Sequence, residues 1–157
     1  MVMKTFNDLV REVEGEVQEI FPWDLEEQMA AGKDVLIVDV REPYEFDAMH
    51  IPDSINVPRG VLETAAEWDY EETVAELVNA RDDYVVVACR SGNRSIFAAR
   101  VLAQMGFRNV VSLKTGLRGW NEYEQPLVDE GGDPITVEEG DAYFATKLMA
   151  DQRRPDR

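Results

Sequence analysis

The sequence has few of the side chains that bind metals or form disulfides. Its 157 residues include one cysteine, Cys89, and one histidine, His50. A single cysteine cannot close a disulfide within the chain, so thiol chemistry has to use this one sulfur atom. One cysteine and one histidine cannot supply the four ligands of a structural zinc site, and we expect neither a metal nor another cofactor. A lone thiol is compatible with a reducing compartment. Together with the lack of a membrane span and of a signal peptide, described next, this makes the cytoplasm the expected location.

Long apolar runs are absent as well. No segment approaches the roughly 20 apolar residues that a membrane-spanning helix needs. The N-terminal stretch MVMKTFNDLVREVEGE is charged and lacks the apolar centre of a signal peptide. Hydrophobic residues make up 45% of the chain, which is typical of a folded soluble protein, and the length suits one domain with its own core.

Positive charge is scarce. Sixteen lysines and arginines face 32 aspartates and glutamates, so the formal net charge is −16. Such a surface repels nucleic acid and anionic membranes, which makes both poor partners. An anionic substrate would need a local positive pocket. The simplest interpretation of the overall acidity is that it confers solubility.

The apolar pattern predicts an α/β fold, with a mainly parallel central sheet and helices on both faces. Asp24 is the expected N-cap of the second helix and Gly32 its end. Strands are expected at 16–20, 35–40, 54–58, 84–88 and 109–113. Helices or helical turns are expected at 4–14, 22–34, 42–50, 61–80, 95–105 and 117–124.

The pattern also divides the chain. Residues 1–15 form an amphipathic helix whose face of Phe6, Leu9 and Val13 suits a core or dimer contact better than a membrane anchor, because the opposite face is acidic. Residues 16–128 form the main domain. Residues 129–157 are expected to be a linker, VDEGGDP at its start, and a tail with a short helix weakened by Gly140.

The lone cysteine follows an apolar strand in the stretch VVVACRSGNRS. Taken alone, a cysteine there could equally be a small core residue. The small residues after it allow a tight loop and a helix N-terminus, and inward-facing N–H groups at such a place bind anions and favour a thiolate. Arg90 and Arg94 lie where the helix dipole disfavours cations, which indicates an anion to be held, or two solvated arginines. We therefore interpret Cys89 as a nucleophile.

Four motifs then resemble one family, the single-domain rhodanese-like sulfurtransferases. They are DVREPYEFDAMHIP (39–52), SINVP (54–58), CRSGNRS (89–95) and TGLRGW (115–120). The resemblance covers about residues 16–128. It implies an α/β sheet with the cysteine in a six-residue loop between a central strand and a helix, and transfer of a sulfane sulfur through a cysteine persulfide.

The resemblance also implies roles for single residues. Cys89 matches the nucleophile, and Asp39 and Arg41 match an acid and a base that shape the site from the neighbouring strand, although they could simply be a salt bridge. Met49 and Asp53 stand where the family has glycine, which concerns a local turn. The residues that match the anion-binding loop are Arg90, Ser91, Gly92, Asn93, Arg94 and, just after it, Ser95.

The implied reaction is a double displacement. A thiolate takes the outer sulfur of thiosulfate or of a persulfide donor, and a thiol, cyanide or a protein acceptor then removes it. No general acid is needed, because sulfite is a stable leaving group, so His50 is interpreted as structural. Trp120 is interpreted as a core residue, and Arg118 as a candidate for the mouth of the site.

Two other interpretations stay open. Cysteine-dependent phosphatases and arsenate reductases also use a loop of amides, an arginine and a thiolate, but space the pair as C-x5-R. Here four residues separate Cys89 from Arg94, and Ser95 occupies the position that this spacing requires. The second alternative is a sulfur carrier or docking module dedicated to one partner protein.

Overall fold

The computed structural model describes residues 2–156. Its strands are β1 (Glu19–Ile20), β2 (Leu36–Asp39), β3 (Ile55–Asn56), β4 (Tyr84–Ala88), β5 (Asn109–Leu113), β6 (Leu127–Val128) and β7 (Pro134–Ile135). Its α-helices are α1 (Phe6–Glu14), α2 (Pro22–Ala30), α3 (Pro43–Ala48), α4 (Leu62–Ala65), α5 (Ala75–Val78), α6 (Asn93–Gln104), α7 (Gly116–Glu122) and α8 (Val137–Phe144). Two short 3₁₀ helices occupy Arg59–Val61 and Ala150–Gln152.

Five strands form one parallel sheet in the order β1-β5-β4-β2-β3. The expected α/β class with a mainly parallel sheet is confirmed. The central strands consist of the apolar runs LIVD and YVVVA, whose residues are nearly all buried because helices cover both sides. Across residues 2–156, no helix is long and apolar enough to cross a membrane.

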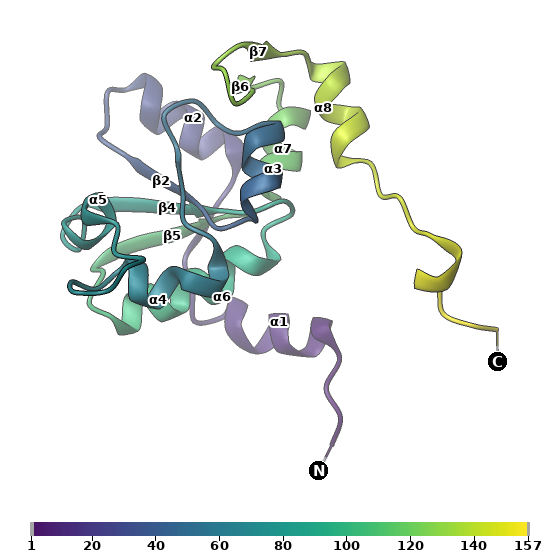
Figure 1. Ribbon diagram of the computed structural model, residues 1–157, viewed down its shortest axis with the longest axis horizontal. Coiled ribbons are helices and arrows are strands. Elements are labelled where there is room, and N and C mark those ends of the chain that lie inside the picture. The colour runs from purple at the N-terminus through teal and green to yellow at the C-terminus, as the bar shows by residue number, and fades with distance from the viewer. Residues whose placement is uncertain (1, 157) are drawn as a thin grey trace.

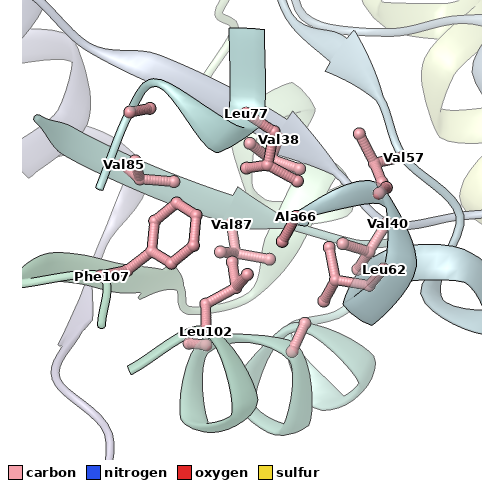
Figure 2. Packing of buried hydrophobic residues seen from close by; sticks show 14 of the residues in the cluster. Val38, Val40, Val57, Leu62, Ala66, Leu77, Val85, Val87, Leu102 and Phe107 are labelled. Carbon is pink, nitrogen blue, oxygen red and sulfur yellow. The ribbon is translucent and has the colours of Figure 1, made fainter. Parts of the chain in front are cut away.

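The helices form one layer on each side of the sheet (Figure 1). On one side, α4, α5 and α6 pack on the strands, and Figure 2 shows Leu102 of α6 beside Val87 of β4 within this core. The core on the other side includes Leu25 of α2, Leu117 of α7 and Phe144 of α8. The central strands β2 and β4 therefore point alternate side chains into two separate cores.

The structure corrects the helix expected at 61–80, which is two short helices with an irregular segment between them. Asp69 in this segment has a φ of +71°, in the left-handed region that ends a helix. The Thr73 hydroxyl accepts a hydrogen bond from the N–H of Tyr70 and donates to the carbonyl of Glu67. Such side-chain bonds compete with helical backbone bonds, which is why the apolar spacing misled here.

Two further expectations are corrected. The N-cap of α2 is Phe21, and Asp24 lies one turn in, where its carboxylate accepts the Phe21 N–H at 2.8 Å. The expected linker after Leu127 begins as a β6–β7 hairpin, closed by Gly132 at a φ of +84°. Its glycines and aspartates indicated a linker because tight turns use the same residue types. The short helix expected beyond it is α8.

Candidate active site

The sequence-predicted residues meet at the carboxyl ends of the two central strands. Cys89 directly follows β4, and Asp39 ends β2, where it lies beside Ala88 in the sheet register. The chain leaves β2 toward β3 on one side and leaves β4 toward β5 on the other. In open parallel sheets, ligands bind where the strand order reverses in this way. The site therefore lies where this topology favours a ligand.

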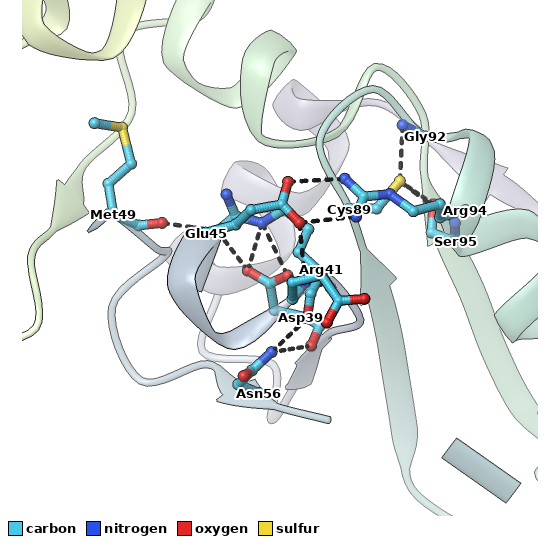
Figure 3. Close-up of polar contacts among 10 residues, drawn as sticks. Asp39, Arg41, Glu45, Met49, Asn56, Cys89, Gly92, Arg94 and Ser95 are labelled. Atoms are coloured by element: carbon cyan, nitrogen blue, oxygen red, sulfur yellow. Dashed lines mark hydrogen bonds and ion pairs between the residues drawn. The ribbon is translucent and has the colours of Figure 1, made fainter. Parts of the chain in front are cut away.

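Two backbone N–H groups donate to the Cys89 sulfur. The N–H of Gly92 is 3.1 Å from Sγ, and the N–H of Ser95 is 3.4 Å away (Figure 3). The Ser95 hydroxyl oxygen is also 3.4 Å from Sγ. Because α6 begins at Asn93, its N-terminal N–H groups point toward the sulfur. This arrangement stabilises negative charge on Cys89 or on an atom attached to it.

Gly92 is required for this loop conformation. It has a φ of +93°, and a Cβ there would lie 3.1 Å from the N of Thr115 and 3.2 Å from the carbonyl oxygen of Leu113. The turn between β5 and α7 also holds the loop, because the N–H of Leu117 donates to the carbonyl of Cys89 at 2.9 Å. The loop is thus a cradle held by contacts with the turn that follows β5.

Sequence reasoning missed Ser112, which supports the cradle from β5. Ser112 and Ser95 are both fully buried, and their hydroxyl oxygens are 2.7 Å apart. When Cys89 is a thiol, Sγ donates to the Ser95 hydroxyl oxygen; when it is a thiolate, a Ser95 hydroxyl that accepts from Ser112 can donate to the sulfur instead. A serine in the run NVVSL reads as an ordinary strand residue, so only the fold reveals this contact.

Glu45 is a second residue that sequence reasoning missed. Arg94 donates to both of its carboxylate oxygens, at 2.9 and 3.0 Å. Burial alone would raise the pKa of Glu45, but the hydrogen bonds from Arg94 and from the Glu42 N–H outweigh it and leave that pKa below its usual value. Hydrogen bonding to Glu45 raises the pKa of Arg94 against the effect of burial. Arg94 is therefore a permanently charged group bound within the protein, close to Cys89.

Asp39 and Arg41 form a buried ion pair below the cradle. Arg41 donates to Asp39 through Nε and Nη2, at 3.0 and 2.8 Å, and Nη2 also donates to the carbonyl of Met49 at 2.7 Å. The side-chain amide of Asn56 donates hydrogen bonds to the backbone carbonyls of both residues (Figure 3). Because Met49 follows α3, the pair fixes the helix that carries Glu45.

Arg90 connects the cradle to the C-terminal segment. Its Nη2 donates to the carbonyl of Phe144 at 2.8 Å and to that of Ala145 at 3.3 Å, at the end of α8, where helix carbonyls favour a cation. Half-buried Tyr143 lies in the field of Arg41, Glu45 and Arg90, and burial raises its pKa. One wall of the site is thus supplied by a segment in which the sequence predicted a tail.

The remaining loop residues face outward. Ser91 and Asn93 are exposed. Ser91 borders an open hollow of about 280 Å³, which it shares with Thr115, Arg118, Gly119 and Glu122. Arg118, a sequence candidate for the mouth of the site, therefore does line a depression beside the cysteine loop.

Residues assigned structural roles from the sequence behave as such. His50 bonds through Nδ1 to the carbonyl of Phe46 at 2.8 Å and stacks on its ring. Trp120 is buried, and its indole N–H donates to the carbonyl of Pro126. Met49 has an extended φ of −166° that does not need glycine. Asp53 has a φ of +66°, in the left-handed region that aspartate tolerates better than most residues.

Comparison with known proteins identifies the family. The model of the rhodanese-like domain matches residues 22–123. The chain belongs to this rhodanese-like domain family. A sulfurtransferase from Allochromatium vinosum is 34% identical over 116 residues, which is 74% of this chain and 99% of that protein. Sulfur transfer in general is the activity that the family and its named relatives support.

Solved structures agree on the rhodanese fold. A thiosulfate sulfurtransferase from Pseudomonas aeruginosa matches 87% of this chain and 26% of its own, with a TM-score of 0.64 and 25% identity. A protein of unknown function from Rhodopseudomonas palustris, for which a tyrosine phosphatase activity has been suggested, matches 80% of this chain and 96% of its own, with a TM-score of 0.69 and 25% identity. The cysteine loop lies within the matched domain, whereas α8 lies beyond it.

Proposed function

We propose that this protein is a sulfurtransferase that carries a sulfane sulfur on Cys89 as a persulfide. The observation that carries the proposal is the pair of backbone N–H groups, of Gly92 and Ser95, that donate to Sγ. These donors are already in place before a substrate binds, so they stabilise developing charge without reorganisation.

The reaction consists of two displacements at sulfur. The Cys89 thiolate attacks the outer sulfur of thiosulfate or of a persulfide donor, the S–S bond of the donor breaks, and its electron pair leaves with sulfite or a thiolate. In the second step, a thiolate or cyanide attacks the terminal sulfur of the Cys89 persulfide and regenerates the Cys89 thiolate. Neither step consumes an oxidant.

The surrounding residues have distinct roles in this proposal. The N–H groups of Gly92 and Ser95 face the sulfur, and exposed Asn93 begins the helix between them. Arg90 and Arg94 add positive charge and hold the loop between α8 and α3, while Ser91 faces the approaching substrate. Asp39 and Arg41 act as positioning residues, because they fix α3 and with it the partner of Arg94.

Contacts of Arg94 support sulfur transfer over phosphatase chemistry. A phosphatase needs an arginine whose guanidinium binds the phosphate oxygens, whereas here both terminal nitrogens of Arg94 donate to Glu45. The cradle also closes around Sγ itself, with two backbone N–H groups within 3.4 Å. Such a small ring suits one sulfur atom better than a tetrahedral phosphate.

The physiological donor and acceptor are proposed by class. The donor is a small sulfur-containing anion or a persulfide, and the acceptor is a thiol, cyanide or a protein thiol. Neither nucleic acid nor a membrane is proposed as a partner. The cytoplasm is the proposed location, and the one free cysteine is compatible with its reducing surroundings.

Steady-state kinetics test the proposal. Thiocyanate formation from thiosulfate and cyanide should follow double-displacement kinetics, with parallel lines in double-reciprocal plots at several fixed cyanide concentrations. Cys89→Ser should abolish the reaction, and neither form should hydrolyse an aryl phosphate. Hydrolysis of the phosphate without thiocyanate formation would overturn the proposal in favour of a phosphatase. Sulfur delivered to a protein thiol, but to no small acceptor, would indicate a dedicated carrier.

A further inference from the structure

The arginines closest to Cys89 already have partners within the protein. Arg41 is fully buried against Asp39, and Arg94 is held by Glu45. Arg90 donates to two carbonyls at the end of α8. Each of these guanidinium groups donates within the protein through at least one nitrogen, although Nη1 of the fully buried Arg41 has no partner. A charged group on a substrate at the outer mouth of the site can instead be bound by exposed side chains there.

Arg118 and Glu122 lie where such partners are needed. The N–H of Arg118 donates to the carbonyl of Arg90 at 3.0 Å, so this residue is fixed directly beside the cysteine loop. Its Nε lies 3.3 Å from a carboxylate oxygen of Glu122, and the two side chains are 48% and 62% exposed. An ion pair this exposed stabilises the fold little, so both groups can bind a ligand at low cost.

Two hollows meet at this pair. The hollow of about 280 Å³ extends from the pair to Ser91 in the cysteine loop. A second hollow of about 190 Å³ extends from the same pair to Phe144 and Ala145, where Arg90 is bound. Both are smaller than the roughly 300 Å³ at which ordinary small-molecule pockets begin. Their volume therefore suits a ligand of a few heavy atoms. Because Arg118 and Glu122 line both hollows, a ligand with one negative and one positive group would match them.

We propose that Arg118 and Glu122 determine specificity for an amino-acid thiol or its persulfide. Arg118 binds the carboxylate of this substrate, Glu122 binds its ammonium group, and the sulfur points past Ser91 toward Cys89. The proposal rests on the proposed function, because it concerns the molecule that delivers or removes the sulfur. In the acceptor direction, the substrate thiolate attacks the terminal sulfur of the Cys89 persulfide, a new S–S bond forms, and Cys89 leaves as the thiolate.

Four thiols distinguish the proposed contact of Arg118 from that of Glu122. Cysteine carries both charged groups, N-acetylcysteine only the carboxylate, cysteamine only the ammonium group, and 2-mercaptoethanol neither. The protein is first loaded with thiosulfate, and loading is verified by intact mass. The rate at which each thiol removes the sulfur is then measured over a range of thiol concentrations. For each thiol, the ratio of variant rate to unmodified rate cancels the thiol's own reactivity.

The expected pattern is specific to each side chain. Arg118→Gln should lower the second-order rate about tenfold for cysteine and N-acetylcysteine, the loss expected for one charge-assisted contact, and leave cysteamine and 2-mercaptoethanol unchanged. Glu122→Gln should lower the rate for cysteine and cysteamine only. In both variants the loss should appear as weaker saturation, not as a lower maximal rate.

Arg108→Gln is the matched control. Arg108 has the same kind of exposed carboxylate partner, Asp82, but it lies at the amino end of β5, whereas the cysteine loop lies at the carboxyl end of β4. The Arg108→Gln substitution should leave the rates with all four thiols unchanged. Equal losses for all four thiols, or no loss for any, in variants that load normally would overturn the inference and leave the proposed function intact. Failure of every form to load, with thiosulfate and also with a small persulfide donor, would contradict the proposed function itself.

Discussion

At the scale of single residues, the chemistry of Cys89 depends on groups that arrive from three elements. Gly92 and Ser95 face the sulfur from the loop and α6, Ser112 supports Ser95 from β5, and Glu45 of α3 holds Arg94. The contacts of the sulfur itself are local in sequence. Those that keep the loop in place come from residues far away along the chain.

Glu45 gives the protein a pH-dependent contribution to stability. Its pKa is lower in the folded protein than the ordinary value of 4.5, so this contribution is complete above pH 4.5 and is lost as the pH falls through the folded value. We expect Glu45→Gln to lower the free energy of unfolding by roughly 1–3 kcal/mol at pH 7, because a charged pair between buried Glu45 and partly exposed Arg94 is broken.

The measurement is urea unfolding of both forms between pH 3 and pH 7. The difference between them should shrink toward acid pH, because the unmodified Glu45 is protonated there. A difference that stays constant across this range would show that the lost stability comes from packing rather than from ionisation of Glu45.

Thr115 carries strain beside the cradle. It is a β-branched residue with a φ of +67°, a conformation that glycine adopts freely. Thr115→Gly should relieve about 1–3 kcal/mol of strain and cost about 0.5–1 kcal/mol in chain entropy. We therefore expect it to raise the free energy of unfolding by about 1 kcal/mol. Thr115→Ala, which also removes the hydroxyl but keeps a Cβ, should gain less in the same denaturation experiment. Equal gains would trace the effect to the hydroxyl.

The sequence predicted the candidate site residues where the evidence for them lies within one short segment. Cys89 and its loop stand out because an apolar strand, a glycine and helix-capping residues follow one another directly. Glu45 and Ser112 could not be found in this way. Glu45 lies in a helical turn 49 residues before Arg94, and only the parallel order of β2 and β4 brings the two together.

At the scale of elements, α8 is part of the site although it lies beyond the matched family domain. It contributes Phe144 to one core, and its last carbonyls bind Arg90. Asn121 of α7 anchors it by donating to the carbonyl of Val137 and to the carboxylate of Asp141. The position of the cysteine loop is thereby coupled to the C-terminal segment.

Gly140 lets α8 approach α7. A Cβ at this position would overlap the side chain of Asn121. We expect Gly140→Ala to destabilise the protein by about 1–3 kcal/mol through overpacking, although alanine favours a helix by about 1 kcal/mol. In an Asn121→Ala background, the same substitution should instead be neutral or stabilising. Thermal unfolding of the four forms gives this cycle, and destabilisation in both backgrounds would exclude the overlap as the cause.

The elements were predictable where they are long and apolar. The runs of β2, β4 and β5 are buried on both faces, so their sequence leaves little alternative to a parallel strand. The prediction of one helix over 61–80 was wrong because apolar spacing does not reveal the left-handed backbone of Asp69 or the hydrogen bonds of the Thr73 hydroxyl. The sequence predicted only that Gly140 weakens a terminal helix. The structure shows that glycine is needed there because Asn121 of α7 leaves no room for a Cβ, and such a tertiary contact is not visible in the sequence.

At the scale of the whole molecule, the net charge of −16 opposes compactness and repels anionic donors. Added salt screens this repulsion. We expect the free energy of unfolding at pH 7 to rise by about 1 kcal/mol between low salt and ~0.3 M KCl, or ~2–4 °C in melting temperature. The rise should be smaller at pH 5, where the net charge is lower. A fall with salt would mean that ion pairs such as Arg94–Glu45 outweigh the general repulsion.

The central claim is that the cradle holds a persulfide on Cys89. The most direct measurement is the intact mass of the reduced protein after reaction with thiosulfate or a small persulfide donor. We predict a gain of one sulfur atom, which cyanide removes and which Cys89→Ser does not show. No gain with either donor, in folded protein whose Cys89 is verified as a free thiol, would contradict the account.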